Sequence, residues 1–496
     1  MDTDVLVVGA GPTGLMLTHE LRVGGVSAVL VDRLPERSEL SRAGGVHPRT
    51  MEVLDQRGLL EPLLATGDYP VSSGHFAGRP LDTEDLDSRL PGRFIPQTVI
   101  EDFLTDRLAD HGIGIRRAHE LVGLAADEDG VTATLRHGTT TGTVRSAFLV
   151  AADGAHSTVR ALLGIAFPGR PGTDTALVAD VRLHDTRPSR PEPGPGGLGQ
   201  SHTVAADGTW AMQFPLGGDL RRLALGGPAH ALPRETPVTG EEIRAGLDTV
   251  YGPGVELVEQ RYAYRITNAA RQVADYRHGR VFLAGDAAHI HLPIGGQGMN
   301  TGLQDAVNLG WKLAATVHGW APQDLLDTYQ SERHPVAARV LRIVQAQGLL
   351  MDWAGTGAAD LAATGELFDT LLQLPDTRRY LAARMAGLDI HYPMPGQPGH
   401  PLLGRRAPDL RLTTPDGPVR LHALLRTGRG LLLDPSGGTD LALVCRRWKD
   451  RVDLVPTDTA TDALLIRPDG HVCWAAPGPH PSEHLERALR RWFGRG

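Results

Sequence analysis

The N-terminal run from Asp4 to Asp32 constrains the fold most strongly, because it reads strand, glycine turn, helix, strand. The stretch DVLVVGA is a continuous apolar run, as expected of a strand buried on both faces. The segment PTGLMLTHELRVGG that follows has apolar residues at helical spacing and ends at two glycines. SAVLVDR then reads as a second buried strand. This order predicts a βαβ unit with a right-handed crossover and a parallel sheet.

The turn in this unit, GAGPTG, fits the pattern G-x-G-x-x-G with Gly9, Gly11 and Gly14. Gly9 is expected to make a tight turn, Gly11 to let a diphosphate approach the backbone, and Gly14 to allow close helix–strand packing. Amides at the start of the helix would meet the diphosphate, helped by the helix dipole. Asp32 would accept a hydrogen bond from a ribose 2′-hydroxyl and would repel a phosphate there. The motif therefore predicts FAD or NAD, against the alternative of a glycine-rich turn in an unrelated α/β protein.

A second copy of the glycine pattern, GPGGLG at 194–199, does not predict a dinucleotide site. It lies in the Pro/Gly-rich stretch 187–199 and has no strand before it, which the motif requires. This stretch is expected to be an exposed, mobile loop.

Length and composition restrict the class of protein. A chain of 496 residues exceeds the size of one hydrophobic core, so two or three domains are expected. The net charge of −8 and the lack of a long basic run argue against nucleic acid or an anionic membrane as the main partner. The acidic N-terminus and the absence of a long apolar run predict neither a signal peptide nor a membrane span. The two cysteines, Cys445 and Cys473, do not form a CxxC pair, so a cytoplasmic protein without a dithiol redox role is expected.

Further patterns of helix, strand and linker follow along the chain. Residues 99–111 are expected to form an amphipathic helix, and 176–265 to contain the strands of an antiparallel sheet. RVFLAG at 280–285 again has the pattern of a buried strand, a helix is expected to begin near Met299, and more helix continues to about 387. Residues 393–407 are typical of a linker, and the C-terminal remainder predicts a small separate α/β domain.

Three further segments carry a family resemblance: SRAGGVHPRTMEVLDQRGL at 41–59, FLVAADGAHSTVR at 148–160 and GDAAHIHLPIGGQGMN at 285–300. Together with the glycine loop they resemble the fingerprints of single-component FAD-dependent aromatic hydroxylases, the para-hydroxybenzoate hydroxylase-like group. The chain is most similar to the actinobacterial branch that oxygenates aromatic polyketides and antibiotics. The resemblance covers nearly the whole chain. It implies an α/β fold with a Rossmann-like FAD-binding domain at 1–175 and 266–392, an inserted antiparallel-sheet substrate domain at 176–265, and a thioredoxin-like domain without CxxC at 400–496.

The resemblance also implies roles for individual residues. Arg42 would contact FAD near its phosphates, Gln97 its ribityl or flavin region, and Asp286 its ribityl chain or diphosphate. Asp153 with Gly154 would serve both FAD and the reductant, and Asp32 stands where the family more often has Glu. The cofactor-binding residues expected on this basis are Gly9, Gly11, Pro12, Thr13, Gly14, Asp32, Arg33, Arg42, Gln97, Leu121, Asp153, Asp286, Pro293, Gly296, Gly298, Met299 and Asn300.

The implied reaction is hydroxylation of a polycyclic aromatic phenol. NADPH or NADH would dock transiently, since the chain has no second valid dinucleotide motif, and reduced flavin with O₂ would give a C4a-hydroperoxide that transfers oxygen to the ring. The aromatic residues Phe76, Phe94, Trp210 and Phe214 are candidate walls for the substrate, with ordinary core packing as the alternative. The oligomeric state is open between monomer and homodimer.

No catalytic base stands out, so the catalytic residue is left unassigned. His47, His75, Tyr262 and Tyr264 are candidates, but a lone His or Tyr more often has a structural role.

The stretch 285–300 raises the question of a metal site, because His289 and His291 alternate. A closed or catalytic metal site needs three or four protein ligands, and no third one is evident, so no metal is expected. The two histidines are expected to hold the loop by local hydrogen bonds. Pro293 and Gly295 to Gly298 would let the backbone pass close to the flavin ring, and the helix at Asn300 would point its amides at it.

Other functions stay open. Baeyer–Villiger oxygenation and inactivating hydroxylation of an aromatic antibiotic use the same flavin chemistry and the same motifs. A flavin halogenase is disfavoured because no W-x-W-x-I-P element is present. A flavin-binding electron-transfer protein without oxygenase activity is the alternative from another class.

Overall fold

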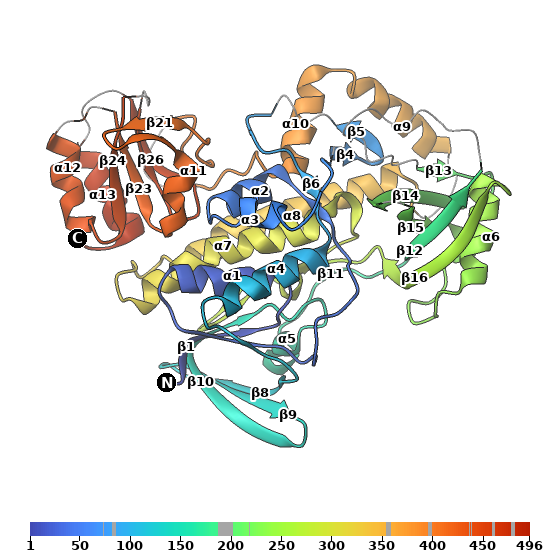
Figure 1. Cartoon of the computed structure of the whole chain (residues 1–496), viewed down its shortest axis with the longest axis horizontal. Coiled ribbons are helices and arrows are strands. Elements are labelled where there is room, and N and C mark those ends of the chain that lie inside the picture. Colours follow the sequence, from blue (N-terminus) through green and yellow to red (C-terminus); the bar gives the residue numbers. More distant parts are fainter. Residues whose placement is uncertain are drawn as a thin grey trace.

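The computed structural model describes residues 1–72, 74–81, 86–186, 202–217, 219–353, 359–394, 399–435, 437, 439–458, 462–477 and 482–496. The stretch 187–199, expected to be a loop, lies outside these residues. Figure 1 shows a central body with the N-terminus at its lower end, a five-stranded sheet on the right and a C-terminal α/β unit on the left. The protein has a mixed α/β fold with a parallel Rossmann-like sheet, antiparallel sheets and a C-terminal domain.

The central body is built on a sheet with the strand order β18–β19–β10–β1–β2–β7. The pairs β19–β10, β10–β1, β1–β2 and β2–β7 are parallel, whereas β9 and β8 extend the sheet from β10 by antiparallel pairing. Val5, Leu6 and Val7 of β1 are fully buried, as predicted for its apolar run. The strands are β1 (Thr3–Val8), β2 (Ala28–Val31), β7 (Ile115–Arg116), β8 (Glu120–Ala126), β9 (Val131–His137), β10 (Thr140–Ala151), β18 (Arg277–His278) and β19 (Val281–Leu283).

Helices cover this sheet, and α1 and α7 pack directly on each other. The helix expected at 99–111 is α4, and the one expected near Met299 is α7, which begins two residues earlier, at Gln297. The helices of the central body and its right-hand extension are α1 (Pro12–Val23), α2 (Pro48–Asp55), α3 (Leu60–Leu64), α4 (Gln97–Ala109), α5 (Thr158–Leu163), α7 (Gln297–Val317), α8 (Asp327–Leu350), α9 (Ala359–Leu371) and α10 (Pro375–Ala386).

Short strands and 3₁₀ turns shape the connections, and the sequence patterns did not predict them. They are the pairs β3 (Gly45–Val46) with β6 (Arg93–Phe94) and β4 (Gly74–Phe76) with β5 (Arg79–Leu81), the small sheet of β11 (Gly169–Arg170), β17 (Ala270–Gln272) and β20 (His289–Ile290), and the turns η2 (Gly285–Ala287) and η3 (Ile294–Gly296).

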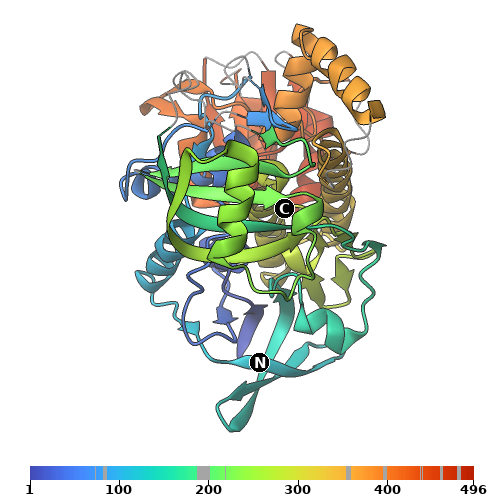
Figure 2. The same cartoon turned by 90° about the vertical axis from the view of Figure 1, so that its right-hand side faces the viewer.

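The second large sheet is antiparallel, with the order β13–β14–β15–β12–β16. Successive residues of β12 point to opposite faces: Leu177 and Ala179 pack under α6, whereas Ala176 and Val178 face the side of α8 and α10. Figure 2 shows α6 lying across the outer face of this sheet. The inner face is therefore free to form a wall toward the central body. The elements are β12 (Thr175–Asp185), β13 (Thr203–Val204), β14 (Trp210–Gly217), β15 (Leu220–Gly226), β16 (Val255–Thr267) and α6 (Gly240–Tyr251).

The C-terminal unit has a four-stranded sheet of order β24–β23–β25–β26. β23 and β24 are parallel, whereas β25 and β26 join by antiparallel pairing. Separate apolar clusters cover its two faces: one lies within the unit, and the other also includes Trp311 and Ala315 of α7. The elements are β21 (Arg411–Thr414), β22 (Gly417–Arg420), α11 (Leu421–Leu424), β23 (Gly430–Asp434), α12 (Thr439–Cys445), β24 (Val452–Pro456), β25 (Asp462–Ile466), β26 (Val472–Pro477) and α13 (Ser482–Phe493).

The turn between β25 and β26 fastens the C-terminal unit to the central body through buried charges. Arg467 pairs with Glu332 of α8, with its Nη2 2.9 Å from Oε2, and Lys312 of α7 donates to the same oxygen at 2.8 Å. All three side chains are at most 2% exposed. Burial raises the pKa of Glu332, but the two cations outweigh it and lower the pKa to about 2. The carboxylate is thus ionised, and the two units are held together by a compensated charge cluster.

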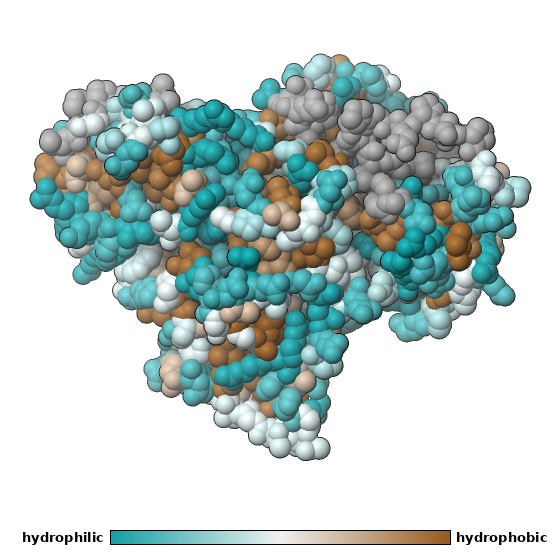
Figure 3. Space-filling model, viewed as in Figure 1, coloured by the Kyte–Doolittle hydropathy of each residue, from teal (hydrophilic) through white to brown (hydrophobic). Residues whose placement is uncertain are grey.

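The face of the molecule in Figure 3 is mostly hydrophilic, with apolar areas separated by polar residues. None of the helices in the described part of the chain combines the length and the apolar composition that crossing a membrane requires.

Candidate active site

The glycine loop after β1 has the geometry that its motif predicts. Gly9 has a φ of +104°, and a side chain there would collide with the backbone of Ala152 at the end of β10. A side chain at Gly14 would collide with the Gly9 carbonyl, so α1 packs closely on the loop. A Cβ at Gly11, in contrast, would meet no atom within 4 Å. Gly11 precedes α1 and provides no side-chain cap, so the amides of its first turn remain available to a ligand.

Asp32 lies at the end of β2, as the motif requires. Its Oδ2 accepts a hydrogen bond from the Ala10 amide at 2.7 Å, and its Oδ1 accepts one from the Leu34 amide at 2.8 Å. The carboxylate thereby stabilises the turn on both sides. Each oxygen can accept a further bond, so a ribose hydroxyl fits beside these two contacts.

The three sequence segments that follow the glycine loop converge on it. The side chain of Thr13 packs so closely against Gly285 and Gly302 that a Cβ on either glycine would collide with it. Arg160 donates to the carbonyl of Ala287 at 2.8 Å and to that of Ala155 at 2.6 Å, which joins the second and third motifs. Segments separated by more than 100 residues of sequence therefore form one site.

A cavity of about 820 Å³ opens beside this junction, between the central body and the inner face of the antiparallel sheet. Of the residues expected to bind the cofactor, those on its wall are Gly11, Pro12, Thr13, Arg42, Gln97, Asp286, Pro293, Gly296, Gly298 and Met299. Gly11, Gly45 and Gly154 also line it, and a Cβ on any of them would meet no atom within 4 Å. The wall is therefore bare backbone at these points, as a tightly bound flat or extended cofactor requires.

Seven of the expected cofactor residues lie away from the cavity wall. Gly9 and Gly14 shape the loop from behind, and Asp32 and Arg33 follow β2. Leu121 of β8 is only 4% exposed and belongs to the hydrophobic core of the central body. The remaining two, Asp153 and Asn300, hold segments that do form the wall.

Asp153 follows β10 and precedes Gly154. Its Oδ2 accepts a hydrogen bond from the Val159 amide at 3.1 Å, whereas its buried Oδ1 has no partner in the described structure. Burial raises the pKa of this carboxyl group. The side chain therefore holds the turn that leads into α5, and the neighbouring Gly154 lines the cavity.

Asn300 connects two walls of the cavity. Its Oδ1 accepts from the His47 amide at 2.9 Å, and its Nδ2 donates to the carbonyls of Gly45 at 2.8 Å and Gly296 at 2.7 Å. Gly295 and Gly296 have φ values of +71° and +64°, a left-handed turn that carries the chain into α7. The start of α7 is thus fixed against the segment that follows Arg42.

Gln97 is the first residue of α4 rather than a loop residue. Its Oε1 accepts from the Ala43 amide at 3.2 Å, and its Nε2 donates to Glu101 at 2.9 Å. Its side chain therefore orders the backbone next to Arg42 on the cavity wall.

Arginines without an acidic partner surround the end of the glycine loop. Arg33, Arg42 and Arg234 form no ion pair with any carboxylate in the described part of the chain, and Arg42 lies 5.9 Å above the Tyr264 ring. Burial and then Arg234, Arg160, Arg33 and Arg42 lower the pKa of His156. These cations can pair with a diphosphate, and the carboxylates of Glu235 and Asp286 lie on the same cavity wall.

The four candidate aromatic residues are placed differently. Phe94 and Phe214 line the cavity. Trp210 is 1% exposed and donates its indole N–H to the Trp353 carbonyl at 3.1 Å, so Trp353 stands between it and the cavity. Phe76 packs on Phe368, with ring centres 5.3 Å apart, and is not on the wall.

Sequence reasoning did not single out Met212, Tyr264 or Ile266 as part of one wall, although they line the cavity. Met212 and Phe214 are two residues apart on β14, and Tyr264 and Ile266 are two apart on β16. Period-two spacing was therefore a signal for these pairs. It does not say which face of the sheet meets the cofactor.

Two histidines on the cavity wall, His47 and His75, are neutral at neutral pH, because burial lowers the pKa of each to about 4. His47 is 2.9 Å from the Gly295 carbonyl through Nε2, and the Nδ1 of His75 accepts from the Gly78 amide at 3.3 Å.

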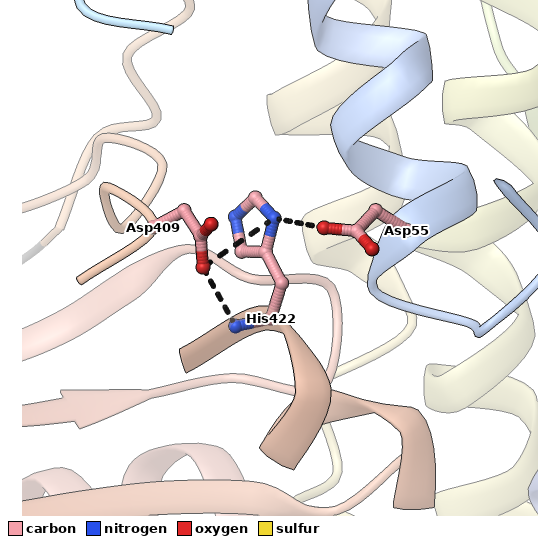
Figure 4. Close-up of side chains that lie close together, drawn as sticks. All are labelled: Asp55, Asp409 and His422. Carbon is pink, nitrogen blue, oxygen red and sulfur yellow. Dashed lines mark hydrogen bonds and ion pairs between the residues drawn. The ribbon is translucent and has the colours of Figure 1, made fainter. Parts of the chain in front are cut away.

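The alternating histidines of the stretch 285–300 diverge. The Nε2 of His289 bonds to Asp305 at 2.8 Å in the interior, and the Nδ1 of His291 bonds to the Leu292 carbonyl at 2.8 Å. In the described residues, one group has three side chains at metal-ligand spacing, namely Asp55, Asp409 and His422. It joins the end of α2 to the C-terminal unit (Figure 4), and none of its three residues lines the cavity. Arg420 pairs with both carboxylates and supplies the charge that a cation would supply.

Comparisons with known proteins agree with this geometry. Residues 2–344 match the family model described as an FAD binding domain, and residues 400–496 match the one described as the C-terminal part of aromatic-ring hydroxylases. The chain is 45% identical to a 12-dehydrotetracycline 5-monooxygenase/anhydrotetracycline 6-monooxygenase of Streptomyces rimosus, over 100% of this chain and 99% of the relative. It is 41% identical to a rifampicin monooxygenase of Streptomyces venezuelae, over 99% and 98% of the two chains.

Among solved structures, the anhydrotetracycline hydroxylase OxyS from Streptomyces rimosus superimposes with a TM-score of 0.88 at 44% identity, covering 100% of this chain and 99% of that one. The resemblance read from the four sequence motifs is thus confirmed, and so is FAD as the cofactor. The chain belongs to the FAD-binding aromatic-ring hydroxylases and is an FAD-dependent aromatic monooxygenase.

Proposed function

We propose that this enzyme hydroxylates a polycyclic aromatic polyketide-type phenol, using O₂ and NADPH or NADH as the reductant. The observation that carries the proposal is the position of the cavity, which has the dinucleotide loop at one end and the apolar inner face of the antiparallel sheet at the other. Relatives that are similar over their whole length act on tetracycline-type substrates.

FAD would lie with its diphosphate at Gly11 and the first turn of α1, near Arg42 and Asp286. The arginines would supply positive charge, the glycines without a side chain would supply space, and Asp32 would supply an acceptor for a ribose hydroxyl group. When bound and reduced, FAD supplies the activation of O₂ that the reaction needs. The protein's own part is to hold the ring system of the substrate and to exclude water.

The cavity of about 820 Å³ would receive FAD along the glycine loop, and the substrate would lie beside it at the apolar face of the antiparallel sheet. Phe94, Met212, Phe214, Tyr264 and Ile266 give it apolar walls with one hydroxyl group. The pKa of Tyr264 is raised by burial, so this hydroxyl is protonated and can donate a hydrogen bond to a substrate oxygen.

We also propose the domain limits 1–175 with 266–392, 176–265 and 400–496, and a thioredoxin-like origin for the last domain. The order β24–β23–β25–β26 supports this origin. Burial raises the pKa of the thiol of Cys445 to about 11, and Cys473 is likewise buried, so neither thiol supports a redox role. The two free cysteines also support a reducing compartment such as the cytoplasm.

A direct test uses the purified protein loaded with FAD. Oxidation of NADPH and of NADH is followed by absorbance, with and without anhydrotetracycline or an anthraquinone-type phenol, and the products are analysed by mass spectrometry. The proposal expects the aromatic compound to stimulate oxidation and a product heavier by one oxygen atom. A yellow protein whose NAD(P)H oxidation no aromatic compound stimulates would instead favour the electron-transfer function.

Inactivating oxygenation of an aromatic antibiotic is a second candidate, favoured by the similarity to a rifampicin monooxygenase. Adding rifampicin as a separate substrate distinguishes the two, and the structure of the product distinguishes hydroxylation from Baeyer–Villiger insertion.

A further inference from the structure

The loop that carries Asp286 is held from behind by Asp305 of α7. The Oδ2 of Asp305 accepts a hydrogen bond from the Gly285 amide at 3.2 Å and lies 2.8 Å from the Nε2 of His289. Asp305 and His289 are at most 1% exposed. Because these contacts fasten the chain before and after Asp286, they fix the point where its side chain reaches the cavity wall.

Asp305 is itself oriented by Arg333 of α8. The Nε of Arg333 donates to Oδ1 at 2.7 Å, and its Nη2 donates to the carbonyl of Thr301 at 3.2 Å. Burial raises the pKa of Asp305, but Arg333 and His289 outweigh it and hold the pKa below its usual value. The carboxylate therefore stays ionised, and each of its oxygens has an assigned donor.

The third nitrogen of the Arg333 guanidinium, Nη1, connects Arg333 to the C-terminal domain through Tyr392. This nitrogen donates to the hydroxyl of Tyr392 at 3.0 Å. The Tyr392 amide donates to the Gly404 carbonyl at 2.8 Å, and the Gly404 amide donates to the Val472 carbonyl at 2.8 Å. The ring of His471, from the turn before β26, lies 4.3 Å from the ring of Tyr392. The C-terminal domain thus holds the backbone and one side of the ring of Tyr392, while Val336 of α8 packs on the same ring.

We propose that Asp305 is the positioning residue for the Gly285–His289 loop, and that the C-terminal domain sets its orientation through Tyr392 and Arg333. If the buried Arg333 guanidinium lost one of its three hydrogen-bond acceptors, it would have to move to reach another acceptor. The Asp305 carboxylate bonded to it would then move as well. The role in cofactor binding rests on the proposed function, because Asp286 is placed beside FAD only there.

The test compares Tyr392→Phe, which removes only the hydroxyl, with a matched change at the same domain boundary. Asp409→Asn alters the cluster of Asp55, Asp409 and His422 (Figure 4), which includes the last residue of α2 and, among the residues that the structure describes, has no hydrogen bond to the Gly285–His289 loop. Both variants disturb the contact between the domains, but only the first interrupts the path to Asp305.

Hydrogen–deuterium exchange of the apoprotein is read at a peptide covering 281–291, and the Kd for FAD is measured by titration. Tyr392→Phe is expected to speed exchange there and to raise the Kd about tenfold, the effect of one lost hydrogen bond to a charged group. Asp409→Asn is expected to leave both as in the wild type. Asp305→Asn, which keeps the shape of the side chain, is expected to change both more strongly than Tyr392→Phe.

Equal effects of Tyr392→Phe and Asp409→Asn would overturn the proposal, because the domain contact as a whole would then be responsible. Wild-type exchange at 281–291 in Tyr392→Phe would overturn it as well, as would faster exchange with an unchanged Kd. If the wild type bound no FAD, the proposed function would fail, whereas the exchange data on the apoprotein would still decide whether Tyr392 supports the loop.

Discussion

Gly9 and Gly11 are two residues apart, yet a side chain would meet different surroundings at each. Gly9 needs its positive φ and touches the backbone of Ala152, so it is a requirement of the fold. Gly11 has an ordinary extended conformation and open space beside it, so the fold itself does not require a glycine there. We expect its lack of a side chain to matter for FAD binding instead.

Gly11→Ala is expected to change the free energy of unfolding of the apoprotein by less than about 1 kcal/mol, because the added methyl group meets no atom. It should weaken FAD binding by about tenfold or more, since the methyl group enters the diphosphate site. Gly9→Ala should lose about 1–3 kcal/mol or more of stability, because it adopts a left-handed conformation and collides with backbone. Urea unfolding and FAD titration measure both effects. A strongly destabilised Gly11→Ala protein that binds FAD normally would contradict this assignment.

His19 of α1 gives a prediction on pH. Burial, followed by Arg22 and Arg57, lowers its pKa to about 3, against 6.5 for an ordinary histidine. Below pH 6.5 the His19 side chain takes up a proton in the unfolded chain but not in the folded chain. The free energy of unfolding therefore decreases as the pH is lowered from about 6.5 to about 3. His19→Leu removes this loss. The wild type should lose about 1.4 kcal/mol relative to this variant between pH 7.5 and 5.5.

Urea unfolding of both proteins at the two pH values checks this expectation. Other titrating groups act equally in both proteins and cancel in the comparison. A constant difference between the two proteins across this range would mean that His19 titrates normally in the folded state.

At the scale of elements, the stretch from Gly285 to Asn300 combines three functions in sixteen residues. Its first part, η2, packs against Thr13 and carries Asp286 on the cavity wall. Its glycines turn the chain through left-handed conformations, and Asn300 fastens the start of α7 to the segment 45–47. The two histidines that dominate the sequence form local hydrogen bonds, one toward the interior and one to a neighbouring carbonyl.

Asp286→Ala is expected to weaken FAD retention strongly, because it removes a polar group from the wall beside the glycine loop. His291→Ala should weaken retention less than Asp286→Ala, because the His291 ring, which also lines the cavity, is neutral and bonds through Nδ1 to the Leu292 carbonyl. FAD remaining after gel filtration, and zinc by elemental analysis, are the measurements. Stoichiometric zinc in the wild type that disappears in His291→Ala would show instead that this stretch binds a metal.

At the scale of the whole molecule, the C-terminal domain is joined to the central body by ionised groups that are fully shielded from water. Removing one partner of such a cluster leaves the others uncompensated. An exposed ion pair has no such effect, because water replaces the lost partner. The pair of Arg37 with Asp102, whose carboxylate side chain is 59% exposed, provides the comparison.

Glu332→Gln is expected to cost about 3–5 kcal/mol of stability, because Arg467 and Lys312 would remain buried with less compensating charge. Asp102→Asn should cost at most about 1 kcal/mol. Thermal and urea unfolding of the two variants give these values. Similar small losses in both would mean that water reaches the interface and screens its charges.

The sequence by itself determined the βαβ unit and the shape of the glycine loop, because these depend on local patterns: an apolar run, helical spacing and a turn that only glycine permits. The family followed from the resemblance of four motif segments to a known group of enzymes. Expectations that depended on a long-range contact were only partly correct. Trp210, Met212 and Phe214 share one face of β14, yet Trp353, more than 130 residues later, covers Trp210 and leaves the other two on the cavity.

Only the tertiary structure decided that Asp305, Arg333 and Tyr392 form a continuous hydrogen-bonded path from the C-terminal domain to the Gly285–His289 loop. No local sequence pattern distinguishes these residues, because the spacing of apolar residues within one helix does not depend on a partner 28 or 59 positions away. Packing brings them together, and burial turns ordinary polar residues into obligatory partners, since a charge removed from water must find its compensation inside the protein.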